Sequence, residues 1–294
     1  MIGLDAEGPP RLQLLLLPGN PGFAHFYAPF LCALHAALGG GAAVACASYL
    51  GHHCRTSRPC GRIYGLEEQM ANVAALLRAL QARGAPVAIV GHSLGAYLAL
   101  HATQEVERCG PAAAKRLTGS CAAEPLHVSK VVALFPFMAV DRASLVQRVL
   151  AAAARVPWLM AALGALLGRL PARFVRWVAR RVAGADAHAE AAVQRCLRGP
   201  AFRNFFALAR DEFAAMARPD WRPLARLGPR ATVLCSAHDC WFPDWQAEQV
   251  ARCAPQCQVI ALEGKRHDFC VSVEQSQQVA ERTAALLRPL LLEG

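Results

Sequence analysis

The sequence predicts an α/β fold: a mostly parallel β-sheet flanked by helices, with a helical insertion between the fourth and fifth recognisable strands. Short apolar runs alternate with longer stretches of helical periodicity along the 294 residues. That alternation is typical of parallel sheets covered by helices. About a hundred residues separate the fourth apolar run from the fifth, which is too long for a loop in a compact domain and requires helices of its own.

Six apolar runs are expected to form strands, and five intervening stretches are expected to form helices. The first run contains four consecutive leucines, which suit a strand buried on both faces. It ends at Pro-Gly-Asn-Pro-Gly, where neither a strand nor a helix continues. We expect one domain over residues 1–294 with the insertion, residues 141–222, inside it. The expected strands are residues 12–18, 42–48, 86–90, 130–135, 231–236 and 256–262, and the expected helices are residues 23–38, 66–83, 94–108, 244–252 and 275–287.

Composition excludes several classes of protein. A hydrophobic content of 55% with 18% charged residues excludes a disordered chain. The twelve cysteines are scattered without a CxxC pair, and several lie in apolar runs, so we expect mostly reduced thiols and an intracellular compartment. The first residues lack a basic segment ahead of an apolar one, so no signal peptide is expected.

The net charge of +10 is concentrated in the insertion. Residues 142–185 contain eight arginines and no acidic residue. A basic surface suits either nucleic acid or an anionic membrane. No nucleic-acid-binding motif accompanies these arginines, and they alternate with Leu, Val, Trp and Phe, so we expect a membrane surface as the partner and no nucleic acid.

The insertion combines a short apolar segment with a basic amphipathic one. The uncharged run at residues 156–168 would reach about 20 Å as a helix, short of the roughly 30 Å hydrocarbon core. The pattern indicates a segment that lies in a lipid interface without spanning it. The alternative is a helical lid packed on the core, whose arginines are merely solvated. Residues expected to contact the surface are Trp158, Leu159, Arg173, Phe174, Arg176, Trp177 and Arg180.

The sequence Gly-His-Ser-Leu-Gly at residues 91–95 supplies a candidate nucleophile. It follows a predicted strand and opens a predicted helix, which is the context of a nucleophile elbow. Ser93 would then lie on a tight turn at the carboxyl edge of the sheet. Side chains at Gly91 and Gly95 would crowd that turn.

A serine nucleophile needs a base and a group that orients the base. His267 follows the last predicted strand, and Asp239 follows the fifth, which is the order such elbows use. Two other acids remain open as the orienting group: Asp141 after the fourth strand, and Asp244, which is also explained as the start of a helix. Asp268 is expected to point elsewhere. No metal-ligand spacing is present, so neither a metal nor another cofactor is expected.

Acyl transfer also needs hydrogen-bond donors for the oxygen that becomes negative. One donor is expected to be the backbone N–H of Leu94, directly after the nucleophile. The other is expected from the Pro-Gly-Asn-Pro-Gly loop, through the backbone N–H of Asn20. The alternative is that this loop is a turn without a catalytic role.

Several motifs together resemble the lipid droplet-associated hydrolases, which are serine hydrolases of the α/β-hydrolase fold. The motifs are LPGNPGFAHFY at residues 17–27, IYGLEEQ at 63–69, GHSLGAY at 91–97 and HDCWFP at 238–243, with His267 before Phe269. By this resemblance Ser93, Asp239 and His267 match the family's triad, and the insertion matches the region associated with droplets. Only eleven residues precede the first strand, whereas family members carry a longer segment expected to supply one or two antiparallel edge strands, so we expect either a shorter sheet or a truncated sequence.

The expected function is hydrolysis of a carboxylic ester of a lipid, a sterol ester or an acylglycerol, through an acyl-enzyme. The expected location is the surface of a lipid droplet or the cytosolic face of the endoplasmic reticulum. Two alternatives stay open: a surface protein with little or no turnover, and a thioesterase on the same scaffold.

Overall fold

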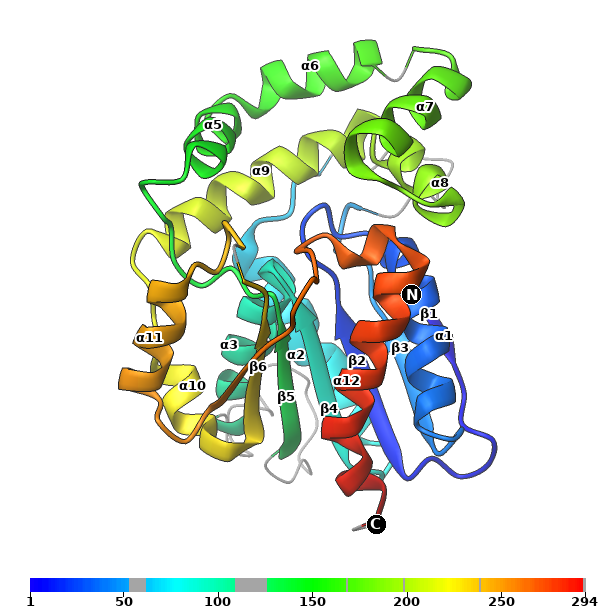
Figure 1. Ribbon diagram of the computed structural model, residues 1–294, viewed down its shortest axis with the longest axis vertical. Helices are drawn as coiled ribbons and strands as arrows, with labels where there is room; N and C mark the ends of the chain where they lie inside the picture. Colours follow the sequence, from blue (N-terminus) through cyan, green and yellow to red (C-terminus); the bar gives the residue numbers. More distant parts are fainter. Residues whose placement is uncertain (53–61, 109–125, 168, 198, 238, 293–294) are drawn as a thin grey trace.

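The computed structural model describes residues 1–52, 62–108, 126–167, 169–197, 199–237 and 239–292 (Figure 1). A seven-stranded sheet of order β1-β3-β2-β4-β5-β6-β7 forms its centre, and all neighbouring strands except β1 and β3 run parallel. The predicted α/β fold is confirmed. The strands are β1 (Ile2–Leu4), β2 (Leu12–Leu17), β3 (Ala42–Cys46), β4 (Val87–His92), β5 (Val128–Leu134), β6 (Ala231–Cys235) and β7 (Gln258–Ala261).

Strand β1 is the element that the sequence did not predict. It pairs antiparallel with β3, placing Ile2 opposite Cys46 and Leu4 opposite Val44. The few residues ahead of β2 therefore supply one antiparallel edge strand. A three-residue strand with partly exposed side chains carries no readable alternation, which is why only the pairing reveals it.

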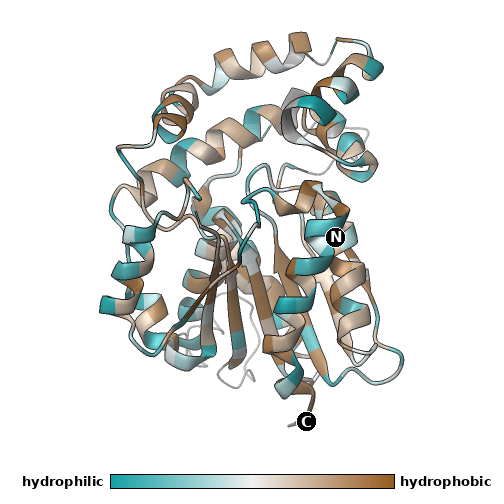
Figure 2. Ribbon diagram, in the orientation of Figure 1, coloured by the Kyte–Doolittle hydropathy of each residue, from teal (hydrophilic) through white to brown (hydrophobic). Residues whose placement is uncertain are grey.

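The leucine run of β2 shows why the sheet is buried on both faces. Successive side chains of a strand point to opposite faces. Leu14 and Leu16 pack in the core under α1 (Ala28–Ala37) and α12 (Val273–Leu292). Leu15 and Leu17 pack in the core under α2 (Leu66–Gln81) and α3 (Leu94–Arg108). The central strands consequently form the hydrophobic middle layer in Figure 2.

A run of helices lies between β5 and β6, and all but the last of them cover the upper end of the sheet in Figure 1. Helix α9 crosses directly above the sheet, while α5, α6 and α7 form the outermost layer. These helices are α5 (Leu145–Ala154), α6 (Pro157–Leu167), α7 (Ala172–Ala183), α8 (Ala187–Cys196), α9 (Gly199–Met216) and α10 (Arg222–Leu227). Helix α11 (Asp244–Cys253) follows β6, and short 3-10 helices occupy Ala24–Tyr27, Gly228–Arg230 and Phe269–Val271.

Within the described residues, no single helix has the length and apolar character needed to cross a membrane. The pair Leu145–Ala154 and Pro157–Gly164 meets that requirement only when taken together, and it is bent by 93° at the break. Seven of the cysteines that the structure describes are free thiols, namely Cys32, Cys46, Cys235, Cys240, Cys253, Cys257 and Cys270, and the cysteines at positions 54, 60, 109 and 121 lie outside the described residues.

Candidate active site

Ser93 lies on the turn between β4 and α3. Its backbone has φ of 52°, in the left-handed region that residues with a side chain adopt rarely and mostly at functional turns. The turn also requires its flanking glycines. A Cβ on Gly91 would lie 2.2 Å from the carbonyl oxygen of Gly95, and a Cβ on Gly95 would lie 2.4 Å from that of Leu17. The strand–turn–helix context predicted for this motif is therefore present.

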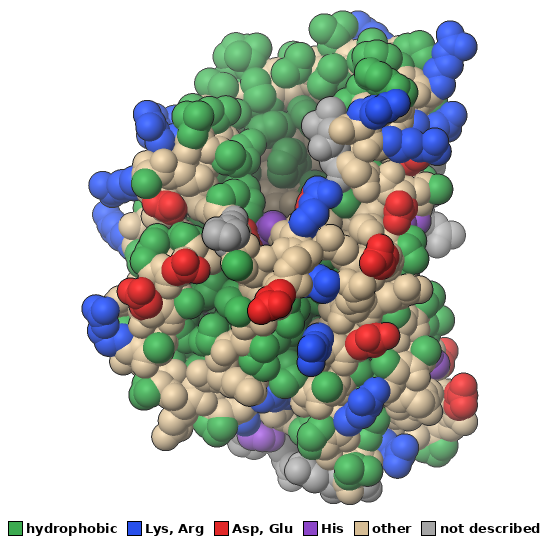
Figure 3. Space-filling view, in the orientation of Figure 1, with side chains coloured by type: hydrophobic (Ala, Val, Ile, Leu, Met, Phe, Trp, Pro, Cys, Tyr) green, Lys and Arg blue, Asp and Glu red, His purple; other side chains and the backbone are tan. Residues whose placement is uncertain are grey.

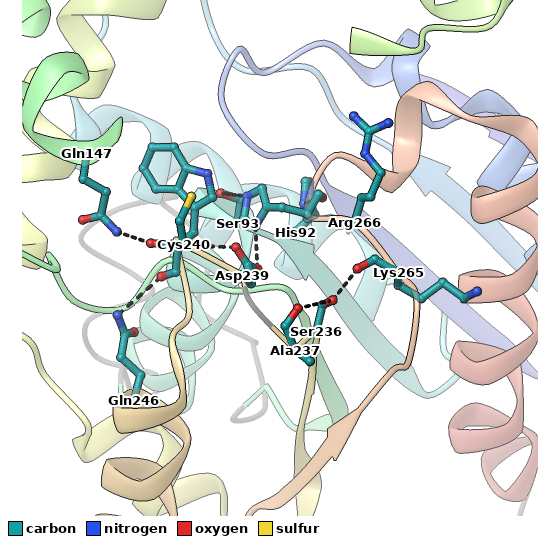
Figure 4. A network of polar contacts seen from close by, with 12 residues as sticks. His92, Ser93, Gln147, Ser236, Ala237, Asp239, Cys240, Gln246, Lys265 and Arg266 are labelled. Atoms are coloured by element: carbon teal, nitrogen blue, oxygen red, sulfur yellow. Dashed lines mark hydrogen bonds and ion pairs between the residues drawn. The ribbon is translucent and has the colours of Figure 1, made fainter. Parts of the chain in front are cut away.

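The structure brings the serine, the histidine and one of the acids into a single hydrogen-bonded chain. The Oγ of Ser93 is 3.1 Å from Nε2 of His267, and Nδ1 of His267 is 2.9 Å from Oδ2 of Asp239. The Asp239 side chain is only 1% exposed, whereas that of His267 is 19% exposed. Figure 4 shows Ser93 and Asp239 within this network.

The other acids lie elsewhere. The Oδ1 of Asp141 accepts a hydrogen bond from the backbone N–H of Ala143. Asp244 occupies the first turn of α11, and Asp268 forms an ion pair with Arg266 at 2.6 Å. Among the residues the structure describes, Asp239 is thus the acid within hydrogen-bonding reach of His267.

The loop that carries Asp239 is held from two sides by glutamines that the sequence did not single out. Gln147 of α5 donates from Nε2 to the carbonyl oxygen of Cys240 at 2.6 Å and accepts from the N–H of Asp141. Gln246 of α11 donates to the carbonyl oxygens of Ala139 and Trp241. Figure 4 shows both amides against this loop. Both glutamines are buried, but a buried glutamine has no signature in a single sequence.

The backbone N–H groups expected to stabilise an oxyanion, those of Asn20 and Leu94, differ from the N–H of Gly19 in their hydrogen bonding. The N–H of Gly19 donates to the hydroxyl of Tyr27 at 2.8 Å and is already satisfied. The N–H groups of Asn20 and Leu94 donate no hydrogen bond within the described part of the chain. Asn20 also lines the same cavity as Ser93. Among the described residues, the N–H groups of Asn20 and Leu94 are therefore available as donors, and their role in stabilising an oxyanion stays a prediction.

The elbow histidine, His92, connects the two loops of the site. Its Nδ1 is 2.5 Å from the Tyr27 hydroxyl, and its Nε2 is 2.8 Å from the carbonyl oxygen of His267. Burial, followed by the nearby His267, lowers the pKa of His92 well below its usual value, so the ring is neutral. The Tyr27 hydroxyl then donates to Nδ1, and the N–H at Nε2 donates to the His267 carbonyl. These contacts give His92 a structural role in the site.

A cavity of about 170 Å³ opens beside Ser93. Figure 3 shows a hollow beneath the upper helices, surrounded by hydrophobic side chains. Its walls come mainly from aromatic and aliphatic side chains of α9 and of the loop after β6. The lining residues are Asn20, Ser93, Leu150, Phe205, Phe206, Ala209, Glu212, Phe213, Trp241 and His267.

Glu212 is an acidic residue of this cavity that the sequence did not indicate as part of the site. It lies on α9, is 5% exposed, and its Oε2 accepts a hydrogen bond from Nδ2 of Asn20 at 3.2 Å. Burial raises the pKa of its carboxyl from 4.5 to about 8, although the hydrogen bond from Asn20 acts in the opposite direction. The local sequence at residues 210–213, Arg-Asp-Glu-Phe, is typical of a solvated helix face. Nothing in this local sequence therefore indicates that the side chain of Glu212 is buried.

The sequence matches the model of a known family, described as lipid-droplet associated hydrolase, over residues 10–270. The chain belongs to this family. Lipid droplet-associated hydrolases of Rattus norvegicus and Homo sapiens are 33% identical over 106 residues and 30% identical over 110 residues. Those alignments cover 31% and 33% of this chain, and they span only about a third of each relative, 32% and 34% of its length.

Solved structures similar to this lipid-droplet associated hydrolase family member confirm the α/β-hydrolase fold. MenH from S. aureus has a TM-score of 0.65 at 14% identity and covers 98% of both chains. A thermophilic esterase from Thermogutta terrifontis has a TM-score of 0.60 at 19% identity, covering 97% of this chain and 92% of its own. A monoacylglycerol lipase from Paleococcus ferrophilus has a TM-score of 0.57 at 17% identity, with 98% of each chain covered.

The outer helices of this family member expose large apolar side chains. Figure 3 shows hydrophobic side chains gathered along the upper edge, with cationic ones beside them. The apolar surface on α5, α6 and α7, with the short turn that joins α6 to α7, is formed by Leu145, Val146, Val149, Trp158, Leu159, Leu163, Leu166, Leu170, Phe174 and Trp177. Four residues expected to contact a lipid surface belong to it, with Trp158 at 69% and Trp177 at 56% exposed, and Leu159 and Phe174 less so.

The three arginines of α7 that were expected to contact a lipid surface do not all have the same partners. Arg180 hydrogen-bonds the carboxylate of Glu190, a buried residue of α8, and Arg176 lies 3.9 Å from the same carboxylate. Arg173 is exposed beside them. Two of the three expected surface arginines therefore also hold α7 against α8. Within the described residues, no cluster of three His, Cys, Asp or Glu side chains is placed to bind a metal ion.

Proposed function

We propose that this protein is a serine hydrolase that cleaves carboxylic esters of lipids through an acyl-enzyme. The observation that carries the proposal is the hydrogen-bonded chain from Ser93 through His267 to Asp239, built on the positive-φ turn after β4. A serine hydroxyl becomes a competent nucleophile when an oriented imidazole can accept its proton.

In the proposed reaction, His267 accepts the proton of Ser93 as Oγ attacks the ester carbonyl. The N–H groups of Asn20 and Leu94 stabilise the negative oxygen that forms. The imidazolium, stabilised by Asp239, then protonates the leaving alcohol, and the acyl-enzyme remains. Water that gives its proton to His267 attacks the acyl-enzyme and releases the fatty acid and the serine.

The apolar walls of the cavity favour a lipid as the substrate. A cavity of about 170 Å³ holds only part of a lipid, because one of roughly 150 Å³ accommodates benzene. The remainder of a sterol ester or acylglycerol would extend towards the helices above. Thioesters are attacked through the same geometry, and they remain the alternative substrate class.

Labelling with a fluorophosphonate probe tests the proposed nucleophile. Such a probe phosphonylates a serine that a neighbouring base activates, so we expect the wild type to be labelled and Ser93→Ala and His267→Ala to be unlabelled. His127→Ala is the matched control. The side chain of His127 is 69% exposed, and it precedes β5, at the end of that strand opposite to Ser93, His267 and Asp239. Labelling of Ser93→Ala at the rate of the wild type would refute the proposal.

We also propose that α5, α6 and α7 contact the surface of a lipid droplet or the cytosolic face of the endoplasmic reticulum, without crossing the membrane. The exposed apolar surface on these helices supports this, because monomeric proteins rarely leave so many large apolar side chains in water. The adjoining arginines suit anionic headgroups. The alternative function, a surface protein with little turnover, would use the same helices. Under that alternative, cells with Ser93→Ala would have the same phenotype as cells with the wild type.

Flotation with phospholipid-coated triacylglycerol droplets tests this contact. Burying one large apolar side chain contributes roughly 1.5–3 kcal/mol, so we expect the double substitution of Trp158→Glu and Trp177→Glu to weaken binding by about 100-fold or more. Trp245→Glu is the matched control, because Trp245 is 41% exposed on α11, away from the outer helices. Unchanged flotation of the double variant would contradict the proposal.

A further inference from the structure

The catalytic steps proposed above assign no task to the carboxyl group of Glu212. Glu212 lies on α9 and lines the cavity together with Ser93 and His267. The remaining walls are largely apolar. An unused carboxyl group in such a place costs free energy, because it has lost water without gaining a full set of partners.

The hydrogen bonds of Glu212 leave one carboxyl oxygen available. Nδ2 of Asn20 donates to Oε2 of Glu212 and, at 3.3 Å, to the carbonyl oxygen of Phe205. The Phe205 carbonyl can only accept, which fixes the orientation of the Asn20 amide. Oε1 of Glu212 makes no hydrogen bond within the part of the chain that the structure describes. Oε1 is therefore the oxygen that a ligand in the cavity can reach.

The carboxyl group is uncharged at neutral pH. Burial raises the pKa of Glu212 to about 8. The titratable groups that face it are His267 across the cavity and the buried Tyr49, whose pKa burial and then Glu212 raise. Among the residues that the structure describes, no arginine or lysine lines the cavity to hold a carboxylate. A protonated carboxyl group donates one hydrogen bond and still accepts others.

We propose that Glu212 is a specificity-determining residue, whose carboxyl group hydrogen-bonds an oxygen of the substrate other than those of the scissile ester. The inference rests on the proposed ester hydrolysis and narrows its substrate class. The preferred substrate carries a free hydroxyl near the ester, as a partial acylglycerol does. The cavity of about 170 Å³ has room for a three-carbon alcohol beside Glu212, whereas a sterol ester has no free hydroxyl left to meet this carboxyl group.

The test compares two soluble esters of one acid that differ only in hydroxyl groups, 1-butyrylglycerol and propyl butyrate. The measured quantity is the ratio of their kcat/KM values. A poorly folded fraction lowers both values equally and cancels in the ratio. We expect the wild type to prefer the glyceryl ester. Glu212→Leu is expected to reduce the ratio by about 3- to 10-fold, the range for one hydrogen bond between uncharged groups.

Glu212→Gln is the matched variant, because an amide also donates and accepts while remaining uncharged, and it is expected to keep the ratio within about twofold. Glu212→Met, a second apolar replacement, is expected to behave as Glu212→Leu does. Equal kcat/KM values for both esters in the wild type, or a preference that survives Glu212→Leu and Glu212→Met, would overturn the inference alone. A wild type that hydrolyses neither ester would overturn the proposed function, and this inference with it.

Discussion

Replacing Asp239 by asparagine is expected to lower kcat by about 10,000-fold. The asparagine amide can donate to Nδ1 of His267, which stabilises the tautomer with its proton on Nε2. That nitrogen then cannot accept the proton of Ser93, although it lies 3.1 Å from Oγ. The measurement is steady-state hydrolysis of butyrate esters, with the rate of fluorophosphonate labelling as a second readout.

Asp141→Asn and Asp244→Asn are the matched controls for this prediction, because both positions were alternatives for the orienting acid. Asp141 accepts from the N–H of Ala143, and Asp244 begins α11, so neither substitution changes a group bonded to His267. Both variants are expected to remain within about threefold of the wild type, as surface substitutions usually do. A loss confined to Asp141→Asn would assign the acid to the loop after β5 instead.

Replacing Glu212 by glutamine is expected to stabilise the protein at alkaline pH and to have little effect at acid pH. The folded-state pKa of about 8 lies above the ordinary value of 4.5, so folding favours the protonated carboxyl. Its stabilising contribution is complete below about pH 4.5 and is lost as the pH rises through 8. The difference of 3.5 units corresponds to up to about 5 kcal/mol above pH 8.

Thermal unfolding between pH 5 and pH 9 measures this effect as a difference in Tm between Glu212→Gln and the wild type. Glutamine resembles the protonated acid and does not titrate, so the difference should grow with pH. Glu263→Gln serves as the control, because Glu263 is exposed after β7. A difference in Tm that is the same at pH 5 and pH 9 would show that Glu212 ionises normally.

Much of the fold was predictable because the sheet is buried on both faces. Strand β2, with six buried residues, appears in the sequence as a run of leucines that only Gln13 interrupts. The six predicted strands are confirmed within about two residues at each end. Strand β1 was not predictable in this way, because its three residues, Ile-Gly-Leu, become a strand only through their pairing with β3.

The candidate catalytic residues were predictable for a topological reason. The carboxyl ends of parallel strands meet at one edge of the sheet, so groups placed just after β4, β6 and β7 converge. Glu212 has no such relation to the sheet. Its position depends on how α9 crosses above the strands, which no local pattern encodes. The ion pair between Arg180 and Glu190 was hidden for the same reason, since it depends on the packing of α7 on α8.

The insertion is attached to the site through side chains on two of its helices. Gln147 of α5 bonds the loop of Asp239, and Glu212 of α9 bonds Asn20 on the loop after β2. Excising the whole insertion would therefore release both loops and also remove the apolar surface on α5, α6 and α7. A truncated protein that lost droplet binding and turnover together could not separate the two activities, whereas single substitutions at Trp158 or Trp177 leave both attachments in place.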